Sequence, residues 1–456
     1  MVKNFDFDLI IIGSGAAGSA AAFSAAATGL NVAIVEAGKW GGSALNSRDL
    51  PFRAATSFSQ LYFNSLHGVK FGLSTKTLRF NYPTVLNWQA LAKKRSGAGS
   101  KKAFEQAGIT CLKGLAHFLS PYELSVNSVR VSAPKFIIAS GAEPNLGGVV
   151  GCDAVKYLTP DSALSVPRPP KTLLIAGAGA TGCEFATYFT TLGTKVCLME
   201  LSDHILPKED IEAQEVLEKY LTDGFGIKVL TESRLTSISP NESGIKATYL
   251  RGGKEKSVVV DEVLLATGSS PALDLGLENA GIKFDQNGII VNNLLQTSMK
   301  HIWAAGDCIG GNSSSERASY EGALAAANAL SHKKNLVSYT GFPRCVQTFP
   351  GVATVGLTES DCLAQHKKYR KSFIPLSAIS ASNTSDFRIG FLKLLSDTQG
   401  KIIGATVMCP EAELIVSELA LAVRHHLSAV ELASTPHVAS SWSELVRLAA
   451  KELAKS

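Results

Sequence analysis

Residues 9–36 decide the fold of the chain and read LIIIGSGAAGSAAAFSAAATGLNVAIVE. The pattern predicts a strand buried on both faces, an Ala-rich helix and a second strand, over residues 9–12, 19–28 and 31–35. Gly13 permits a tight turn, Gly15 lets the backbone approach a pyrophosphate, and Gly18 lets the helix pack closely on the strand. The unpaired N–H groups at the helix N-terminus can hold phosphates, and Glu36 can accept hydrogen bonds from a ribose diol. The segment therefore predicts a dinucleotide site.

The same unit recurs at residues 172–200, which read TLLIAGAGATGCEFATYFTTLGTKVCLME. Gly177, Gly179 and Gly182 take the three glycine positions, and Glu200 ends the second strand. The first glycine and the acid are equally far apart in both units, at about the 20 residues that this fingerprint requires. Two complete units predict two bound nucleotides, and the alternative is one working site beside one structural remnant. A carboxylate at Glu200 suits a 2′-hydroxyl and repels a 2′-phosphate, which favours NADH over NADPH.

Length and composition predict a soluble protein of two or three domains. The chain has 456 residues, of which 45% are hydrophobic and 18% charged, and a net charge of +5. Basic clusters at residues 93–95 and 367–371 carry no nucleic-acid motif, so we expect solvated surface there and no nucleic-acid partner. Eight scattered cysteines show neither C-x-x-C nor metal-ligand spacing, which indicates a reducing compartment and no metal site. No apolar run is long enough to cross a membrane, and we expect a cytoplasmic protein.

A second informative stretch, residues 41–53, reads GGSALNSRDLPFR. It resembles the redox-active segment of the flavoprotein disulfide reductases, the family of dihydrolipoamide dehydrogenase, glutathione reductase and mercuric reductase. That family reads G-G-T-C-L-N-x-G-C-I-P-S-K there, and Ala44 and Asp49 take the places of its two cysteines. The resemblance implies a flavoenzyme with FAD in the first site, near Gly42, and NADH in the second. It also implies that this chain cannot run the family's disulfide chemistry.

The resemblance extends over nearly the whole chain. Three segments look like the family's strands around the cofactors: residues 136–144, 263–268 and 302–307. The resemblance implies that Gly141, Gly268 and Gly306 contact the cofactors. It also implies that Asp307 binds the ribityl chain of FAD. A helix over residues 318–330 is expected to point its N-terminus at the flavin. The implied fold is α/β, with two Rossmann-like nucleotide-binding domains and a C-terminal α+β dimerisation domain. The implied domains are FAD-binding, NAD(P)-binding and interface, over residues 1–148 with 270–338, 149–269 and 339–456.

The resemblance also indicates which side chains would act beside the flavin. A Lys–Glu pair of the family corresponds to Arg53 and Glu184, so an ion pair is expected between them. Asp49 has two interpretations: a proton donor with a raised pKa, or a polar replacement that pairs with Arg48 or is solvated, which we favour. The family's acid/base His corresponds to Ala439 without a gap, and a gap would bring His437 into that position.

These features together predict an FAD-dependent NADH oxidoreductase that passes electrons directly from flavin to a non-disulfide acceptor such as a quinone, a metal ion or dioxygen. The resemblance further implies a homodimer. One alternative is a soluble transhydrogenase, which would exchange hydride between NADH and NADP⁺. The other is a catalytically inactive homologue that binds nucleotides without turning over. Arg53, Glu184 and Asp49 are the candidate catalytic residues under the first hypothesis.

Overall fold

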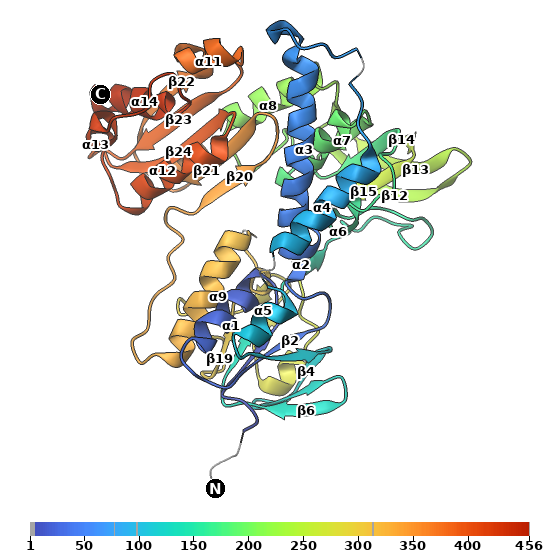
Figure 1. Ribbon diagram of the computed structural model, residues 1–456, viewed down its shortest axis with the longest axis vertical. Helices are drawn as coiled ribbons and strands as arrows, with labels where there is room; N and C mark the ends of the chain where they lie inside the picture. The colour runs from blue at the N-terminus through green and yellow to red at the C-terminus, as the bar shows by residue number, and fades with distance from the viewer. Residues whose placement is uncertain (1–4, 77, 97–98, 312–313, 456) are drawn as a thin grey trace.

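A computed structural model describes residues 5–76, 78–96, 99–311 and 314–455 of the chain. Figure 1 shows one layered α/β part near the N-terminus, a second that contains helix α7, and a C-terminal part in orange and red. The long helix α3 (Asp49–His67) begins beside the first part and runs between the other two. The expected fold class, with two nucleotide-binding domains and a C-terminal dimerisation domain, is confirmed.

The first parallel sheet has the strand order β19-β7-β1-β2-β3, with bounds Ile302–Ala304, Phe136–Ile138, Leu9–Ile12, Val32–Glu36 and Thr110–Lys113. The strand β1 is almost completely buried because alternate residues face different layers. Leu9 and Ile11 pack on the helices α1 (Ala16–Ala26) and α9 (Ser315–Leu330). Ile10 and Ile12 pack on an antiparallel sheet of β4 (Ala116–Ser120), β5 (Glu123–Val126) and β6 (Val129–Ser132).

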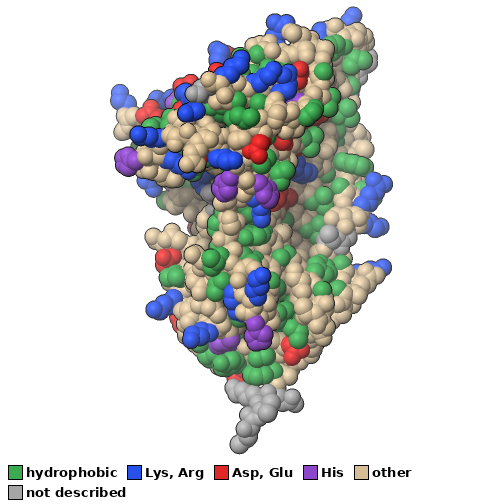
Figure 2. All heavy atoms as spheres, turned by 90° about the vertical axis from the view of Figure 1, so that its left-hand side faces the viewer, with side chains coloured by type: hydrophobic (Ala, Val, Ile, Leu, Met, Phe, Trp, Pro, Cys, Tyr) green, Lys and Arg blue, Asp and Glu red, His purple; other side chains and the backbone are tan. Residues whose placement is uncertain are grey.

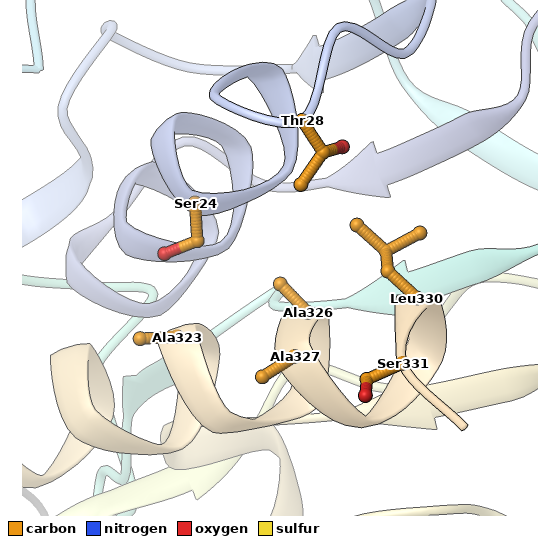
Figure 3. Close-up of a pocket in the computed structure, with 7 residues that line it drawn as sticks. All are labelled: Ser24, Thr28, Ala323, Ala326, Ala327, Leu330 and Ser331. Carbon is orange, nitrogen blue, oxygen red and sulfur yellow. The ribbon is translucent and has the colours of Figure 1, made fainter. Parts of the chain in front are cut away.

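Small side chains let α1 and α9 approach closely. A Cβ on Gly322 would come within 2.0 Å of the backbone oxygen of Ala17, so the two helices meet backbone to backbone there. Toward their C-terminal ends the helices diverge around a groove of about 330 Å³. Figure 3 shows its lining: Ser24, Thr28, Ala323, Ala326, Ala327, Leu330 and Ser331.

The second parallel sheet has the order β11-β10-β9-β15, with bounds Lys228–Leu230, Lys195–Met199, Thr172–Ala176 and Glu262–Leu265. Helices α7 (Ala180–Thr191) and α8 (Ile211–Asp223) pack with it, and an antiparallel sheet of β12 (Ser233–Asn241), β13 (Gly244–Arg251) and β14 (Lys254–Val260) lies beside it. The two parallel sheets repeat the same βαβ arrangement, as the repeated fingerprint predicts.

The C-terminal sheet is antiparallel, with the order β20-β21-β24-β23-β22 and bounds Pro343–Val346, Gly351–Gly356, Ile402–Cys409, Phe391–Ser396 and Arg370–Pro375. Its apolar core includes side chains from α12 (Ala412–Arg424) and α14 (Glu444–Lys455). The remaining helices and strands are α2 (Gly42–Asn46), α4 (Tyr82–Ser96), α5 (Lys101–Gln106), α6 (Pro160–Ala163), α10 (Glu359–Ala364), α11 (Ser380–Ser385), α13 (Ala429–Ser434), β8 (Ala142–Pro144), β16 (Ser269–Pro271), β17 (Phe284–Asp285) and β18 (Gly288–Ile289).

Two helices begin earlier than their sequence predicts. α1 begins at Ala16 rather than at residue 19, because its N-cap is the extended Gly15 inside the glycine loop. α9 begins at Ser315 rather than at residue 318, because the Ser314 hydroxyl caps it by accepting from the Arg317 N–H at 3.1 Å. The glycine loop hides the start of α1, and polar residues hide the start of α9, from an apolar periodicity.

Two further features concern the surface charge and the lengths of the helices. Figure 2 shows Lys and Arg side chains scattered among acidic, apolar and other groups on the face displayed, without a continuous basic patch. Among the described residues, no helix combines the length and apolarity that a membrane span requires.

Candidate nucleotide and redox site

The first glycine loop has the close contacts that its sequence predicts. Gly13 has φ +100°, and a Cβ there would lie 2.1 Å from the Ala139 oxygen. A Cβ on Gly18 would lie 1.8 Å from the Gly13 oxygen, so only glycine lets the helix pack on the loop. A Cβ on Gly42 would lie 2.6 Å from the Cα of Gly15, which brings the start of α2 against the same loop.

Glu36 lies at the end of β2 and already holds the loop in place. Its Oε2 accepts from the Ser14 N–H at 2.9 Å and from the Ser14 hydroxyl at 2.5 Å, and its Oε1 accepts from the Gly38 N–H at 2.6 Å. A carboxylate oxygen has more than one lone pair, so these bonds leave room for a ribose hydroxyl.

The second loop repeats this geometry. Gly177 has φ +98°, and a Cβ on Gly182 would again lie 1.8 Å from the oxygen of the first glycine. Glu200 is 8% exposed, and it accepts from the Ala178 N–H at 2.7 Å and from the Ser202 N–H at 3.0 Å. Gly179 has open space where its Cβ would stand, directly at the start of α7.

Both loops fit the phosphates of a dinucleotide. The N-cap residues of α1 and α7 are Gly15 and Gly179, and no side chain of the described chain caps either helix. The N–H groups of the first helical turn are therefore available to a pyrophosphate, in the field of the helix dipole. The residues present suit FAD in the first site and a nicotinamide dinucleotide in the second.

The remaining expected cofactor contacts are Gly141, Gly268, Gly306 and Asp307. Asp307 begins a short 3₁₀ helix directly after Gly306, whose N–H donates to the buried Glu321 carboxylate at 2.8 Å. Gly141 and Gly268 both have positive φ, with open space where a Cβ would stand. Contacts of these residues to a cofactor stay predictions.

Arg48 does not pair with Asp49, which corrects one half of the favoured interpretation, whereas the exposure of Asp49 agrees with its other half, a solvated carboxyl. Arg48 instead binds Asp161 with two contacts, Nε to Oδ1 at 3.0 Å and Nη2 to Oδ2 at 3.2 Å, and Ser47 adds a hydroxyl bond at 2.6 Å. Asp49 accepts from the Ser315 hydroxyl at the start of α9. The carboxyl is open to solvent on one side, yet the protein around it desolvates it enough to raise its pKa.

Arg53 and Glu184 share a neighbour rather than a direct bond. Within the described chain, no ion pair shorter than 4.0 Å joins them, which corrects the expected pair. The Gln347 N–H donates to Glu184 Oε1 at 2.9 Å, and the Gln347 side-chain oxygen accepts from Arg53 Nη2 at 2.9 Å in the amide orientation that satisfies both groups. Gln347 keeps the two charges apart, because it satisfies each of them separately.

Burial raises the pKa of Glu184 from 4.5 to about 7, against the lowering effects of the Gln347 N–H and the Arg53 charge, and the Asp49 charge raises it further. A carboxyl with this pKa can take up or release a proton near neutral pH. The site therefore holds two carboxyl groups with raised pKa values, Glu184 and Asp49, with Arg53 as their shared cation.

Sequence reasoning missed Gln347, Ser315, Asp161 and Cys345. Cys345 lies two residues before Gln347, and the charges of Arg53 and Glu184 both act on its thiol. Burial and the charge of Glu413 raise the pKa of Cys345 to about 12, so this thiol stays protonated and is a poor nucleophile. All eight cysteines are free. No local motif marks these residues. Only the tertiary fold brings β20 and α9 close to residues 41–53, the segment that resembles the family's redox-active segment.

The C-terminal candidates, His437 and Glu444, make their hydrogen bonds within the C-terminal domain. The ring of His437 is bound at Nδ1 by the Thr435 oxygen at 2.8 Å and at Nε2 by Glu418 at 2.9 Å, and its side chain is 3% exposed. Glu444 accepts from the Ser440 N–H and the Ser380 hydroxyl, each at 3.1 Å. Both side chains therefore bind neighbouring groups, and within the described chain Glu444 makes no hydrogen bond to the His437 ring.

Solved structures show the same fold along the chain. LpdA from Mycobacterium tuberculosis matches with a TM-score of 0.87 and 25% identity, over 98% of this chain and 99% of that one. The HOCl-induced flavoprotein disulfide reductase RclA from Escherichia coli matches with a TM-score of 0.86 and 22% identity, over 97% of this chain and 99% of that one.

Curated proteins match over similar lengths. A mercuric reductase of Staphylococcus aureus is 30% identical over 98% of this chain and 82% of its own length. A dihydrolipoyl dehydrogenase of Bacillus subtilis is 30% identical over 92% of this chain and 93% of its own. The model of the pyridine nucleotide-disulphide oxidoreductases matches residues 7–329, and the dimerisation-domain model of the same family matches residues 342–450. The chain therefore belongs to the pyridine nucleotide-disulphide oxidoreductase family, a family of flavoprotein oxidoreductases.

Proposed function

We propose that the protein is an FAD-dependent NADH oxidoreductase that transfers electrons from the flavin directly to a non-disulfide acceptor. The observation that carries the proposal is the replacement of the family's thiol pair by Ala44 and Asp49, in a chain whose two glycine loops keep their geometry. Cys345, on whose thiol the charges of Arg53 and Glu184 act, is kept protonated by burial. Relatives in the same family carry the names of mercuric reductase and dihydrolipoyl dehydrogenase, so the difference concerns the acceptor.

The residues of this chain would divide the work as follows. FAD supplies the hydride and electron-transfer chemistry when it is bound. Arg53 offers a fixed positive charge, and the Gln347 side chain holds its guanidinium in place. Glu184 exchanges a proton near neutral pH, and Asp49 keeps its proton to a higher pH than an ordinary carboxyl. Either group can supply a proton to an acceptor, because burial raises the pKa of both carboxyls.

The preference for NADH follows from Glu200. Its carboxylate is fixed by two backbone N–H groups and lies where a ribose 2′-hydroxyl is expected. A 2′-phosphate would place a second negative charge against it. We assign the domains as FAD-binding, NAD(P)-binding and interface, over residues 1–148 with 270–338, 149–269 and 339–456. The dimerisation domain supports a homodimer, and the free thiols support a reducing compartment such as the cytoplasm.

An anaerobic reductive titration tests the proposal. The protein with FAD bound should take up about two electrons per flavin, because the flavin is the one carrier. Uptake of about four electrons, with a long-wavelength band from a thiolate beside the flavin, would show a hidden disulfide and overturn the proposal. A Cys345→Ala variant shows whether any extra uptake comes from that thiol.

Rapid mixing with NADH separates the alternatives. Fast reduction by NADH and slow reduction by NADPH supports the proposal, whereas equal rates with transfer to NADP⁺ favour a transhydrogenase. A flavin that stays oxidised with both nucleotides would show a binding protein without redox turnover.

A further inference from the structure

Gln347 stands between the two charged side chains of the candidate site, and it uses a different group for each of them. Its backbone N–H donates to Glu184 Oε1 at 2.9 Å. Its side-chain oxygen, in the same amide orientation as above, accepts from Arg53 Nε at 3.2 Å and from Arg53 Nη2 at 2.9 Å. Any residue except proline would keep the first bond, but only a side chain with an acceptor oxygen can make the second. The choice of side chain at this position therefore concerns Arg53.

The backbone on both sides of Gln347 is held by packing. Val346, the last residue of β20, is 4% exposed and belongs to the same apolar core as Phe52 of α3 and Cys183 of α7. Thr348, on the other side, is buried to the same extent. Gln347 thus reaches α3 and α7 from a third element, whose place is set by apolar contacts and not by the two charges.

A neutral acceptor changes what Arg53 can bind. A guanidinium prefers a carboxylate, with which it makes a two-pronged and charge-assisted pair. The Arg53 charge acts on the carboxyl groups of Glu184 and Asp49. Within the described chain neither carboxyl forms an ion pair with Arg53, whose guanidinium is bound to the Gln347 oxygen instead.

We propose that Gln347 is a positioning residue, whose side chain holds the Arg53 guanidinium off Glu184 and leaves Glu184 free to release and take up a proton during turnover. This role rests on the proposed function, in which NADH is the electron donor. NADH delivers two electrons and one hydrogen as a hydride, whereas a quinone that becomes a quinol gains two hydrogens, so each turnover consumes one proton. Glu184 would supply that proton and regain it from the solvent.

The titratable groups that face Glu184 come from each element packed against it. Burial raises the pKa of Glu184, the charge of Arg53 on α3 lowers it, and the charge of Asp49 on α3 raises it further. Burial, with the Glu184 charge as a smaller contribution, raises the pKa of Cys345 on β20 and of Cys183 on α7, so both thiols stay protonated and add no charge. Arg53 is therefore the cation whose distance decides how firmly Glu184 holds its proton.

Thermal unfolding of the FAD-bound protein between pH 4.5 and about 7 tests the proposal, because the change of the midpoint with pH gives the number of protons released on unfolding. Folded Glu184 keeps a proton that the unfolded chain has lost in this range. Gln347→Met keeps the backbone N–H and a similar side-chain length but has no acceptor oxygen, so Arg53 should pair with Glu184. At about pH 6 the wild type should release about one proton more than this variant.

The double variant Gln347→Met, Arg53→Met should release that proton again, because no cation remains to pair with Glu184. A merely structural role of Gln347 would lower the midpoint equally at every pH, and loss of Arg53 would not reverse it. Gln60→Met is the matched control, since Gln60 is exposed on the same helix as Arg53, and it should behave like the wild type.

Turnover gives a separate measurement, with NADH as the donor and benzoquinone as the acceptor. The pH profile of kcat should move to lower pH by at least about one unit in Gln347→Met, and the double variant should not show this shift. Equal proton release from the wild type and Gln347→Met, or a loss that Arg53→Met does not restore, would overturn the proposal. A wild type that oxidises NADH with no acceptor would refute the proposed function, and the proton count would still decide the role of Gln347.

Discussion

Lys393 is completely buried, and its replacement by Met should destabilise the protein strongly. Its ammonium lies 3.0 Å from Asp210 Oδ1, 2.5 Å from Glu212 Oε2 and 2.8 Å from Glu359 Oε2. Asp210 and Glu212 stand at the start of α8, whereas Lys393 belongs to β23, so the cluster joins the second nucleotide-binding part to the C-terminal sheet. Met fills a similar volume without a charge, which leaves three carboxylates together.

The buried ion pair sets the magnitude expected for this substitution, and the lowered pKa of Glu359 supports its direction. Removal of one partner from a buried ion pair costs about 3–5 kcal/mol, because the remaining charges stay desolvated. Burial alone would raise the pKa of Glu359, but hydrogen bonds from Lys393, Tyr369 and Lys371 outweigh it and lower the pKa from 4.5 to about 2. That change corresponds to about 3 kcal/mol, divided among the three donors. We expect Lys393→Met to lower the free energy of unfolding by about 3 kcal/mol at neutral pH.

Urea unfolding of the FAD-saturated protein measures this loss through the fluorescence of Trp442, which packs against the C-terminal core. Lys371→Met is the control, because Lys371 binds the same Glu359 at 3.1 Å with a side chain that is 54% exposed. It should cost less than about 1 kcal/mol. Equal effects of the two substitutions, or a loss below about 1 kcal/mol for Lys393→Met, would refute the reasoning.

The acid limb of the stability curve gives a further check on the same cluster. The pKa of Glu359 is lower in the folded chain than in the unfolded one. Its contribution is therefore complete above pH 4.5 and is lost as the pH falls toward about 2. The difference in stability between wild type and Lys393→Met should narrow over that range.

Three other substitutions test the candidate site. The pKa of Glu184 is raised to about 7, so the folding stability should fall as the pH rises from 4.5 toward 7. Glu184→Gln should remove this fall in the thermal midpoints measured across that range. An unchanged dependence of the midpoint on pH would contradict the assignment. Glu200→Gln should lower the preference of kcat/KM for NADH over NADPH by about tenfold, and an unaltered ratio would exclude Glu200 as the discriminating group. If Asp49 supplies a proton, the rate of acceptor reduction should decline as the pH rises through the raised pKa of Asp49. Asp49→Asn should flatten this pH–rate profile. The same decline in the variant would assign the proton to another group.

The sequence predicted the central strands of the two parallel sheets, for a local reason. A glycine at positions 13, 18, 177 or 182 is required by contacts of 1.8–2.4 Å that any Cβ would make, so the spacing itself encodes the turn. Strands such as β1 and β9 follow directly, because four or five consecutive apolar residues before such a loop fit only a doubly covered sheet.

The contacts of the charged side chains could not be predicted in the same way. Arg48 is adjacent to Asp49, yet it binds Asp161, because the helix start turns their side chains apart and α6 comes close. Arg53 and Glu184 do approach the same place, but Gln347 from a third segment lies between them.

The sequence by itself determined the two nucleotide loops, the family and the loss of the thiol pair, because each of these is a property of residues close together in the chain. Only the tertiary structure decided the partners and the pKa values of Asp49, Glu184 and Cys345. The physical reason is that desolvation and charge pairing depend on which segments meet in space, and segments from β20, α6 and α9 complete these environments.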